Sequence, residues 1–222
     1  MQKESKLLDA AAAVPFIPIP NFAIDFPVGL ELWHRAGGRL SFAIGDVCFT
    51  QFVAADADAL FALRNHPSVL PFMPGARAIP HARHLEWVRT TLLQHGAGTP
   101  LIVLGRAAGQ PVAFGILKPT AEAGTLEIGV IVAGDWQSSM LPPRLGGALI
   151  ALAAQLFGAD TLVSYVSEQH GLALRLNSGV GLLRAETSDK PGEHRFRTPI
   201  RELVSTAIYR RCTRGLRVNL TQ

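Results

Sequence analysis

Residues 125–157 read TLEIGVIVAGDWQSSMLPPRLGGALIALAAQLF, and this stretch decides the fold of the chain. Its first part, 125–133, is nearly all apolar and rich in Ile and Val, which predicts a strand buried on both faces. A turn follows at 134–137, and the prolines at 142–143 can open a helix that good helix formers continue to Phe157. A strand that leads through a loop into a helix N-terminus is a typical anion-binding unit, because free amides and the helix dipole converge there.

The composition is that of a globular protein. The 222 residues suffice for one domain, or for one domain with an extension. Apolar residues make up 48% of the chain, which is enough for a sizeable core and argues against disorder. The net charge of +4 suits a small anionic ligand, and it is too weak to indicate a nucleic-acid partner.

Cysteine usage and hydropathy indicate a cytoplasmic protein. The two cysteines, Cys48 and Cys212, form neither a metal-binding motif nor a disulfide framework, which favours a reducing compartment. No apolar run reaches the roughly 18 residues of a membrane span. The short apolar run near the N-terminus is interrupted by Asp9 and does not indicate an export signal.

Residues 1–45 predict an N-terminal extension. Prolines are dense over residues 1–28 and alternate with large apolar side chains, which predicts an extended arm that packs on the domain or across a homodimer. Short strand patterns at 30–35, 39–44 and 47–53 then indicate a small antiparallel meander.

The rest of the chain predicts a mixed α/β domain over residues 46–199, with a C-terminal helix and a basic tail over residues 200–222. We expect one central sheet flanked by helices. The predicted helices are 54–65, 81–94, 142–157, 170–178 and one from 199 to 211; the predicted strands are 101–106, 111–118, 125–133, 161–166, 181–187 and 194–198.

This order resembles the GNAT superfamily of acyl-CoA-dependent N-acetyltransferases, over roughly residues 46–187. The branch that acetylates ribosomal-protein N-termini and spermidine is the most similar. Its first strand and helix resemble residues 47–73, and its second helix resembles HLEWV at 84–88. LEIGV at 126–130 resembles the start of its fourth strand, and Gln137 stands where its glycine-rich cofactor loop begins. The register then runs without a gap from Gln137 to Leu182.

The sequence departs from the family at the cofactor loop. The two family glycines, which let the backbone approach a pyrophosphate, are replaced by Met140 and Pro142, and the proline also removes an amide donor. Gly146 and Gly147 could form a displaced glycine loop, with Arg144 supplying charge to the phosphates. The family Asn that closes the cofactor groove is His170.

The sequence also departs from the family at the residue that protonates the leaving thiolate. The tyrosine that many members use to protonate the thiolate falls at Asn177, which cannot act as an acid at neutral pH. Some relatives lack this tyrosine, so its loss alone does not remove activity.

The resemblance implies acetyl-CoA or another acyl-CoA as the co-substrate and a small-molecule or peptide amine as the acceptor. A carboxylate or an imidazole near the fourth strand would be the base, and Glu127 is the best-placed acid. Backbone amides of Val130, Ile131 and Val132 would hold the pantetheine and polarise the thioester carbonyl. The other residues that the resemblance assigns to the cofactor are Gln137, Ser138, Ser139, Met140, Leu141, Arg144, His170 and Ala173.

Two features leave alternatives open. The altered cofactor loop also fits a GNAT-fold protein that has lost catalysis and serves as a binding or regulatory module, or one that uses another acyl donor. His81 and His84 lie three residues apart on one predicted helix, a spacing that could serve a metal. No cysteine or acid at matching spacing joins them, so we expect no metal site.

Overall fold

A computed structural model describes residues 39–73, 76–93, 98–184 and 188–221. The predicted N-terminal arm and the strand pattern at 30–35 lie outside these residues. The described residues form a mixed α/β structure around a single eight-stranded sheet of order β7-β6-β5-β4-β3-β2-β1-β8. Its strands are β1 (Arg39–Ile44), β2 (Val47–Gln51), β3 (Leu101–Ala107), β4 (Gln110–Pro119), β5 (Thr125–Val132), β6 (Thr161–Ser167), β7 (Glu193–Pro199) and β8 (Val218–Thr221).

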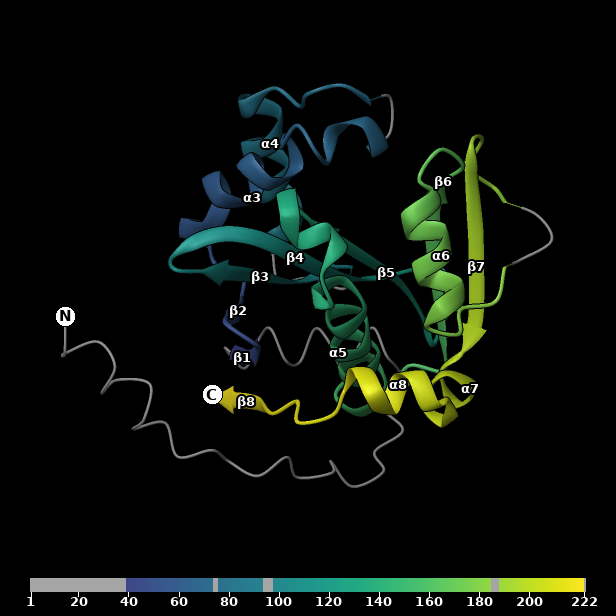
Figure 1. Cartoon of the computed structure of the whole chain (residues 1–222). Helices are drawn as coiled ribbons and strands as arrows, with labels where there is room; N and C mark the ends of the chain where they lie inside the picture. Colours follow the sequence, from purple (N-terminus) through teal and green to yellow (C-terminus); the bar gives the residue numbers. More distant parts are fainter. Residues whose placement is uncertain (1–38, 74–75, 94–97, 185–187, 222) are drawn as a thin grey trace.

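Helices cover both faces of this sheet (Figure 1). The α-helices are α3 (Ala57–Arg64), α4 (His81–Trp87), α5 (Leu141–Gln155), α6 (Gly171–Gly179), α7 (Ile200–Ser205) and α8 (Ala207–Cys212). Shorter turns of helix are the 3-10 segments η1 (Ala54–Asp56), η2 (Leu70–Phe72) and η5 (Gly134–Ser138), and the π-helical turn η4 (Val88–Leu92).

Two apolar cores lie on opposite faces of the sheet. One joins α5 to the sheet face that carries Leu126, Ile128 and Val132, as period-two alternation along β5 requires. The other joins α3 and η4 to the face that carries Phe114 of β4. The sheet is therefore buried on both faces in its middle, which explains the almost unbroken apolar run at 125–133.

Strand pairing changes at β5. It pairs with β4 along nearly its whole length in antiparallel register, from Leu126 opposite Pro119 to Val132 opposite Ala113. With β6 it pairs in parallel, and only over Thr125–Glu127. Beyond Glu127 the two strands separate, and this separation creates the space for the site described below.

Several boundaries differ from the predicted ones for local reasons. The helix predicted at 54–65 begins as η1, where the Asp56 carboxylate accepts a hydrogen bond from the Val53 amide (2.9 Å) and pairs with Arg106 (2.6 Å). The helix predicted at 199–211 is two helices, α7 and α8. Thr206 separates them, because its side chain accepts a hydrogen bond from the Tyr209 amide and so caps a new helix.

The strand predicted at 181–187 is not formed by its described residues, of which Arg184 alone pairs, through an isolated bridge to Phe196. The predicted basic tail was wrong in another way, because it ends in β8, an unpredicted strand that adds to the sheet beside β1. No helix within the described ranges combines the length and the apolar character that crossing a bilayer requires.

Candidate active site

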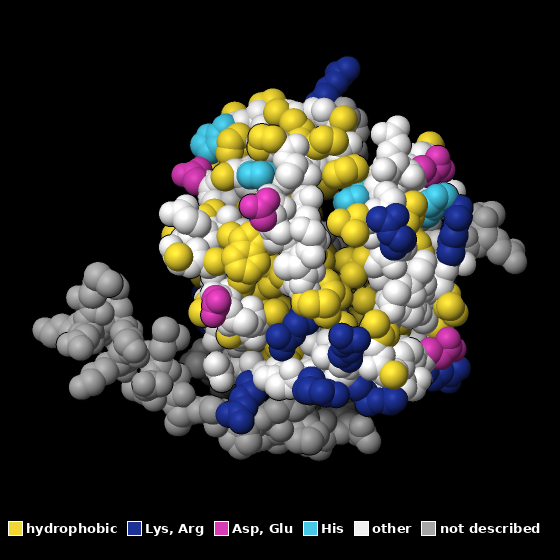
Figure 2. Space-filling model, in the orientation of Figure 1, with side chains coloured by type: hydrophobic (Ala, Val, Ile, Leu, Met, Phe, Trp, Pro, Cys, Tyr) yellow, Lys and Arg dark blue, Asp and Glu magenta, His cyan; other side chains and the backbone are white. Residues whose placement is uncertain are grey.

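A pocket of about 540 Å³ fills the space between β5 and β6. This volume lies within the roughly 300–1,000 Å³ that is usual for small-molecule sites. Ile128–Val132 of β5 and Ser164–Ser167 of β6 form its two walls, and α5 and α6 contribute its floor. Figure 2 shows apolar side chains gathered in this hollow, with Lys and Arg side chains below it.

The pocket continues through the gap onto both faces of the sheet, and its two halves are lined by different elements. The α5-side half is lined by Ile128, Val130, Ile150, Leu176, Val180 and Leu182, which belong to or pack against the core on α5. The α3-side half is lined by Val69, Phe72, Met73, Phe114, Ile116 and Ile131, of which all but Phe72 belong to or pack against the core on α3.

Backbone groups of β5 face this pocket. The Ala133 amide donates to the Val112 carbonyl of β4 (2.9 Å), so by alternation the groups of Val130 and Val132 point away from β4, towards β6. The Val132 carbonyl accepts a hydrogen bond from Gln137 Nε2 (2.8 Å). Since the pairing with β6 ends at Glu127, the Val130 amide and carbonyl are directed into the pocket. Of the three predicted backbone donors, Ile131 is directed towards β4 instead.

Gln137 holds the loop after β5 in place. Its Nε2 donates to the Val132 carbonyl and to the carbonyl of Ser68 (3.0 Å), which joins the end of β5 to the segment after α3. Ser138 and Ser139 also line the pocket, but their hydroxyls donate to the carbonyls of Asp135 and Trp136 within the same turn. These three side chains therefore shape the pocket wall by local hydrogen bonds.

The start of α5 does not form the predicted amide cradle for a pyrophosphate. The Leu141 amide donates a hydrogen bond to Ser139 Oγ (3.0 Å), and Pro142 and Pro143 carry no N–H. The Arg144 amide donates to the Met140 carbonyl (3.2 Å). A helix N-terminus binds anions through free amides, and the amides of residues 141–144 are either bonded or absent.

The proposed displaced glycine loop is also not present. α5 begins at Leu141, so Gly146 and Gly147 lie inside the helix. A Cβ on Gly147 would come within 2.9 Å of the Cys212 Cβ, which shows that this glycine serves the close approach of α8 to α5. Gly146 lines the pocket, and a Cβ there would meet open space.

Three of the residues predicted for the cofactor lie outside the pocket lining. Leu141 is buried in the core with 4% of its surface exposed, and Met140 is 52% exposed to solvent. Arg144 donates from Nη2 to the Arg214 carbonyl (3.3 Å), on the segment after α8. Burial raises the pKa of the Cys212 thiol on α8, and the charges of Arg144 and Arg211 oppose this shift.

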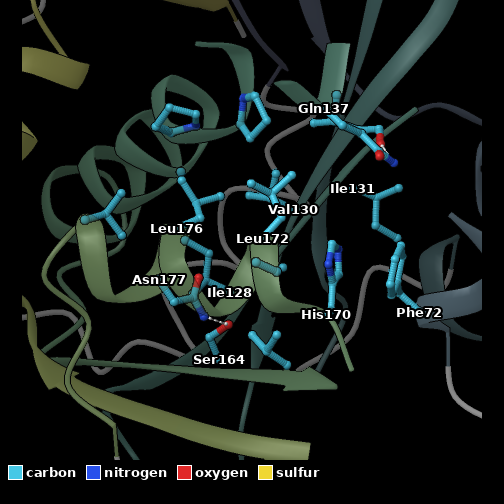
Figure 3. A pocket seen from close by; sticks show the side chains of 18 of the residues that line it. Phe72, Ile128, Val130, Ile131, Gln137, Ser164, His170, Leu172, Leu176 and Asn177 are labelled. Atoms are coloured by element: carbon cyan, nitrogen blue, oxygen red, sulfur yellow. Dashed lines mark hydrogen bonds between the residues drawn. The ribbon is translucent and has the colours of Figure 1, made fainter. Parts of the chain in front are cut away.

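His170 and Ala173, both predicted from the resemblance, line the pocket. The imidazole of His170 stacks on the ring of Phe72, with 3.7 Å between centroids and 13° between planes, and so joins α6 to η2 across the pocket (Figure 3). Burial lowers the pKa of His170, which keeps the ring neutral at pH 7.

Asn177 lies deeper in the pocket. Its Nδ2 donates to Ser164 Oγ of β6 (3.0 Å), which links α6 to β6 close to where β5 and β6 separate (Figure 3). Neither group can release a proton near neutral pH, but both can form hydrogen bonds with a ligand.

Glu127, the predicted base, lies at the last residue pair between β5 and β6, on the face opposite Ile128. Its carboxylate is 3.6 Å from Lys118 Nζ and 3.7 Å from Lys190 Nζ, and its side chain is 28% exposed. It does not itself line the pocket. Lys190 also lies over the ring of Tyr165, a pocket residue whose pKa is raised by burial and by its hydrogen bond to Asp189.

Sequence reasoning missed the α3-side half. Phe72 stands between Pro71 and Pro74, and a large aromatic residue in a proline-rich loop is a signal that could have been used. The contributions of Phe114 and Ile116 could not be found that way, because inward-facing residues of a buried strand look alike whether they line a core or a pocket.

Solved structures share this fold at low sequence identity. Spermidine N-acetyltransferase from Vibrio cholerae, in complex with CoA and spermine, superposes with a TM-score of 0.58 at 10% identity and covers 73% of this chain and 100% of its own. N-acetyltransferase from Staphylococcus aureus Mu50 gives 0.55 at 15% identity, with coverage of 69% and 98%. An uncharacterised protein from Bacillus halodurans gives 0.62 at 13% identity, with coverage of 76% and 91%. Neither the protein-family models nor the curated proteins gave a match to this sequence.

Proposed function

Because the chain has the fold of the GNAT N-acetyltransferases, we propose that it is an acyl-CoA-dependent N-acyltransferase that transfers an acetyl group to a primary amine. The observation that carries this proposal is the separation of β5 from β6 beyond Glu127, which opens a pocket of about 540 Å³ between these two strands. A pocket that reaches both faces lets a donor and an acceptor meet at one point.

The acyl donor is proposed to lie in the α5-side half. Its pantetheine arm has amide groups along an apolar chain, and the unpaired Val130 amide and carbonyl offer it the hydrogen bonds of an added strand. Ala173 and Leu176 supply apolar contacts, and His170 closes the wall. The Val130 amide is also the donor that we assign to the thioester carbonyl, where negative charge develops during the reaction.

The phosphates of CoA are proposed to be held by side-chain charge. The amides at the start of α5 are bonded or absent, whereas Arg144 lies in the first turn of α5 and Arg211 lies on α8, which packs against α5. Ile208 of α8 lines the pocket one turn before Arg211. Guanidinium groups pair well with phosphate oxygens, so they can replace the missing amide cradle.

Glu127 is proposed as the general base, acting through water. An alkylammonium with a pKa near 10.4 must lose a proton before its nitrogen can attack. The nitrogen then bonds to the thioester carbon and the C–S bond breaks. The first proton passes through Glu127 to solvent, and the second N–H proton goes to the departing thiolate, so that CoA leaves as a free thiol.

Thermal unfolding with CoA and acetyl-CoA tests this proposal. A ligand at about 100 times its Kd stabilises the folded state by about 2.7 kcal/mol, so the midpoint should rise with ligand concentration. Ala173→Phe, which fills the α5-side half, should abolish the rise. Ser178→Phe, an exposed position on the same helix outside the pocket lining, should retain it.

The outcome also decides between enzyme and binding module. Stabilisation by acetyl-CoA, together with thiol release when an amine is added, supports the enzyme. No stabilisation at millimolar CoA would contradict the proposal and leave a protein of this fold that binds something else.

A further inference from the structure

Six apolar side chains line the α3-side half of the pocket. They are the aliphatic, aromatic and thioether side chains named above, and the imidazole of His170 stacks on Phe72 beside them. Val69 and Phe114 are buried, whereas Phe72, Met73, Ile116 and Ile131 are partly exposed.

The lining carries no counter-charge for a polycation. Among the described residues that line the whole pocket there is no Asp, Glu or Lys, and Arg175 on α6 is the one permanently charged side chain. Two acids outside the lining have partners already: Glu127 lies between Lys118 and Lys190, and Asp189 accepts a hydrogen bond from the Tyr165 hydroxyl. Burying a second ammonium group in this half has a desolvation cost that no ion pair offsets.

From this lining we infer that the acceptor is a monoamine with an apolar body, aliphatic or aromatic, and not a polyamine. The inference rests on the proposed function, because it assigns the α5-side half to the acyl donor. The apolar body packs on Ile116, Ile131 and Phe72, and the amine points through the gap towards the end of the β5–β6 pairing.

A matched pair of amines tests the inference. Hexylamine and 1,5-diaminopentane are equally long and differ in a terminal methyl against a second ammonium. With acetyl-CoA as donor, we expect kcat/KM for hexylamine to exceed that for the diamine by at least roughly 100-fold, because the buried second charge has no partner.

A carboxylate added to the α3-side half should shift this preference. Met73→Glu should reduce the hexylamine-to-diamine ratio by roughly 10-fold or more, since the new acid can pair with the second ammonium. Leu85→Glu introduces the same charge at an exposed position of α4 outside the pocket, and it should leave the ratio as in the wild type.

Three results would overturn the inference while the proposed function stands. One is equal or better turnover of the diamine or of spermidine. Another is an unchanged ratio in Met73→Glu. The third is a higher kcat/KM with octanoyl-CoA than with acetyl-CoA, together with loss of the preference for hexylamine. That result would mean that the acyl chain of the donor occupies the α3-side half.

A binding measurement covers the case in which neither amine is acetylated. Saturation-transfer NMR with CoA present should then show binding of hexylamine and none of the diamine, and any other pattern contradicts the inference. Failure of CoA to stabilise the protein would instead contradict the proposed function, so the two failures are distinguishable.

Discussion

Glu127 is the residue on which the proposed chemistry depends. Its position follows from strand register: it is the last residue of β5 opposite β6, so its backbone adjoins the point where the pocket begins. Lys118 and Lys190 hold its carboxylate from two sides. The sequence could select it as the one acid within the predicted strand at 125–133, but could not reveal the two lysines, which come from separate strands and turns.

Replacing Glu127 by Gln should lower kcat/KM for the amine by about 100-fold or more, as removal of a general base usually does. The affinity for CoA should stay within a factor of about 2, because the side chain does not line the pocket. Steady-state kinetics and CoA titration measure the two quantities.

Glu122→Gln provides the matched control. Glu122 lies in the turn just before β5, and its carboxylate pairs with Arg197 of β7. Its replacement should leave kcat/KM close to the wild-type value. An equal loss of kcat/KM in the two variants would show that Glu127 has no special role in the reaction.

At the scale of single elements, α5 shows how two adjacent glycines differ. Gly146 faces open space at the pocket, whereas Gly147 lies against Cys212 of α8. The helix itself disfavours both, because glycine costs about 1 kcal/mol relative to alanine inside a helix. Tertiary contact therefore decides the effect of a substitution at each position.

Gly146→Ala should raise the free energy of unfolding by up to about 1 kcal/mol. Gly147→Ala should lower it by about 1–2 kcal/mol, because a Cβ at 2.9 Å from the Cys212 Cβ forces α8 to shift. Urea denaturation of both variants checks the pair. A stabilised Gly147→Ala would show that α8 moves freely relative to α5.

The helix pair α3–α4 depends on a buried histidine. His84 is 1% exposed and its Nε2 bonds the Ala57 carbonyl (2.9 Å) of α3, so Nε2 carries the proton. Its Nδ1 is buried without a partner, and protonation there would bury a charge. Burial accordingly lowers the pKa of His84.

The folded protein should therefore lose stability on acidification. A histidine whose folded pKa is lowered binds fewer protons in the folded chain than in the unfolded one, so stability rises with pH up to the unfolded value of about 6.5 and falls below it. NMR titration should place the His84 midpoint below that value. His84→Gln, which keeps a donor for Ala57, should reduce the slope of unfolding free energy against pH between about pH 5.5 and 6.5. A midpoint at or above the unfolded value would contradict the burial argument.

At the scale of the whole molecule, charge is unevenly placed. The net charge is only +4, yet Figure 2 shows Lys and Arg side chains gathered below the hollow, and the charges of Arg144 on α5 and Arg211 on α8 both act on Cys212. A local excess of arginine attracts a phosphate-bearing ligand more than the net charge suggests. Because these side chains are exposed or partly exposed, salt screens their attraction.

The Kd for CoA should accordingly increase with salt concentration, measured by calorimetry. Arg144→Gln should raise that Kd about 5-fold, the equivalent of about 1 kcal/mol for an exposed ion pair, and should weaken the salt dependence. Arg89→Gln removes an equal charge from η4, where the guanidinium pairs with Glu86. Arg89→Gln should leave the Kd for CoA unchanged. An equal rise of the Kd in this variant would show that net charge, and not the position of Arg144, determines the affinity.

Local sequence patterns were enough to predict the fold and most of the element order, although β8 and the break between α7 and α8 were not predicted. The apolar run at 125–133, the prolines at 142–143 and the turn at 189–192 are local signals, because strand and helix preferences depend on neighbouring residues. Predictions that followed from these signals, such as β5, α5 and β7, agree with the structure within one or two residues.

What the site can hold depends on contacts that appear only in the folded protein. The pairing of β5 with β6 ends at Glu127, the amides of α5 are bonded to Ser139 and Met140 or absent, and the α3-side half is apolar. Each of these depends on contacts between segments far apart in the chain or on hydrogen bonds that residue types alone do not specify. Local preference therefore fixed the strand and helix that frame the pocket, and long-range packing fixed its chemistry.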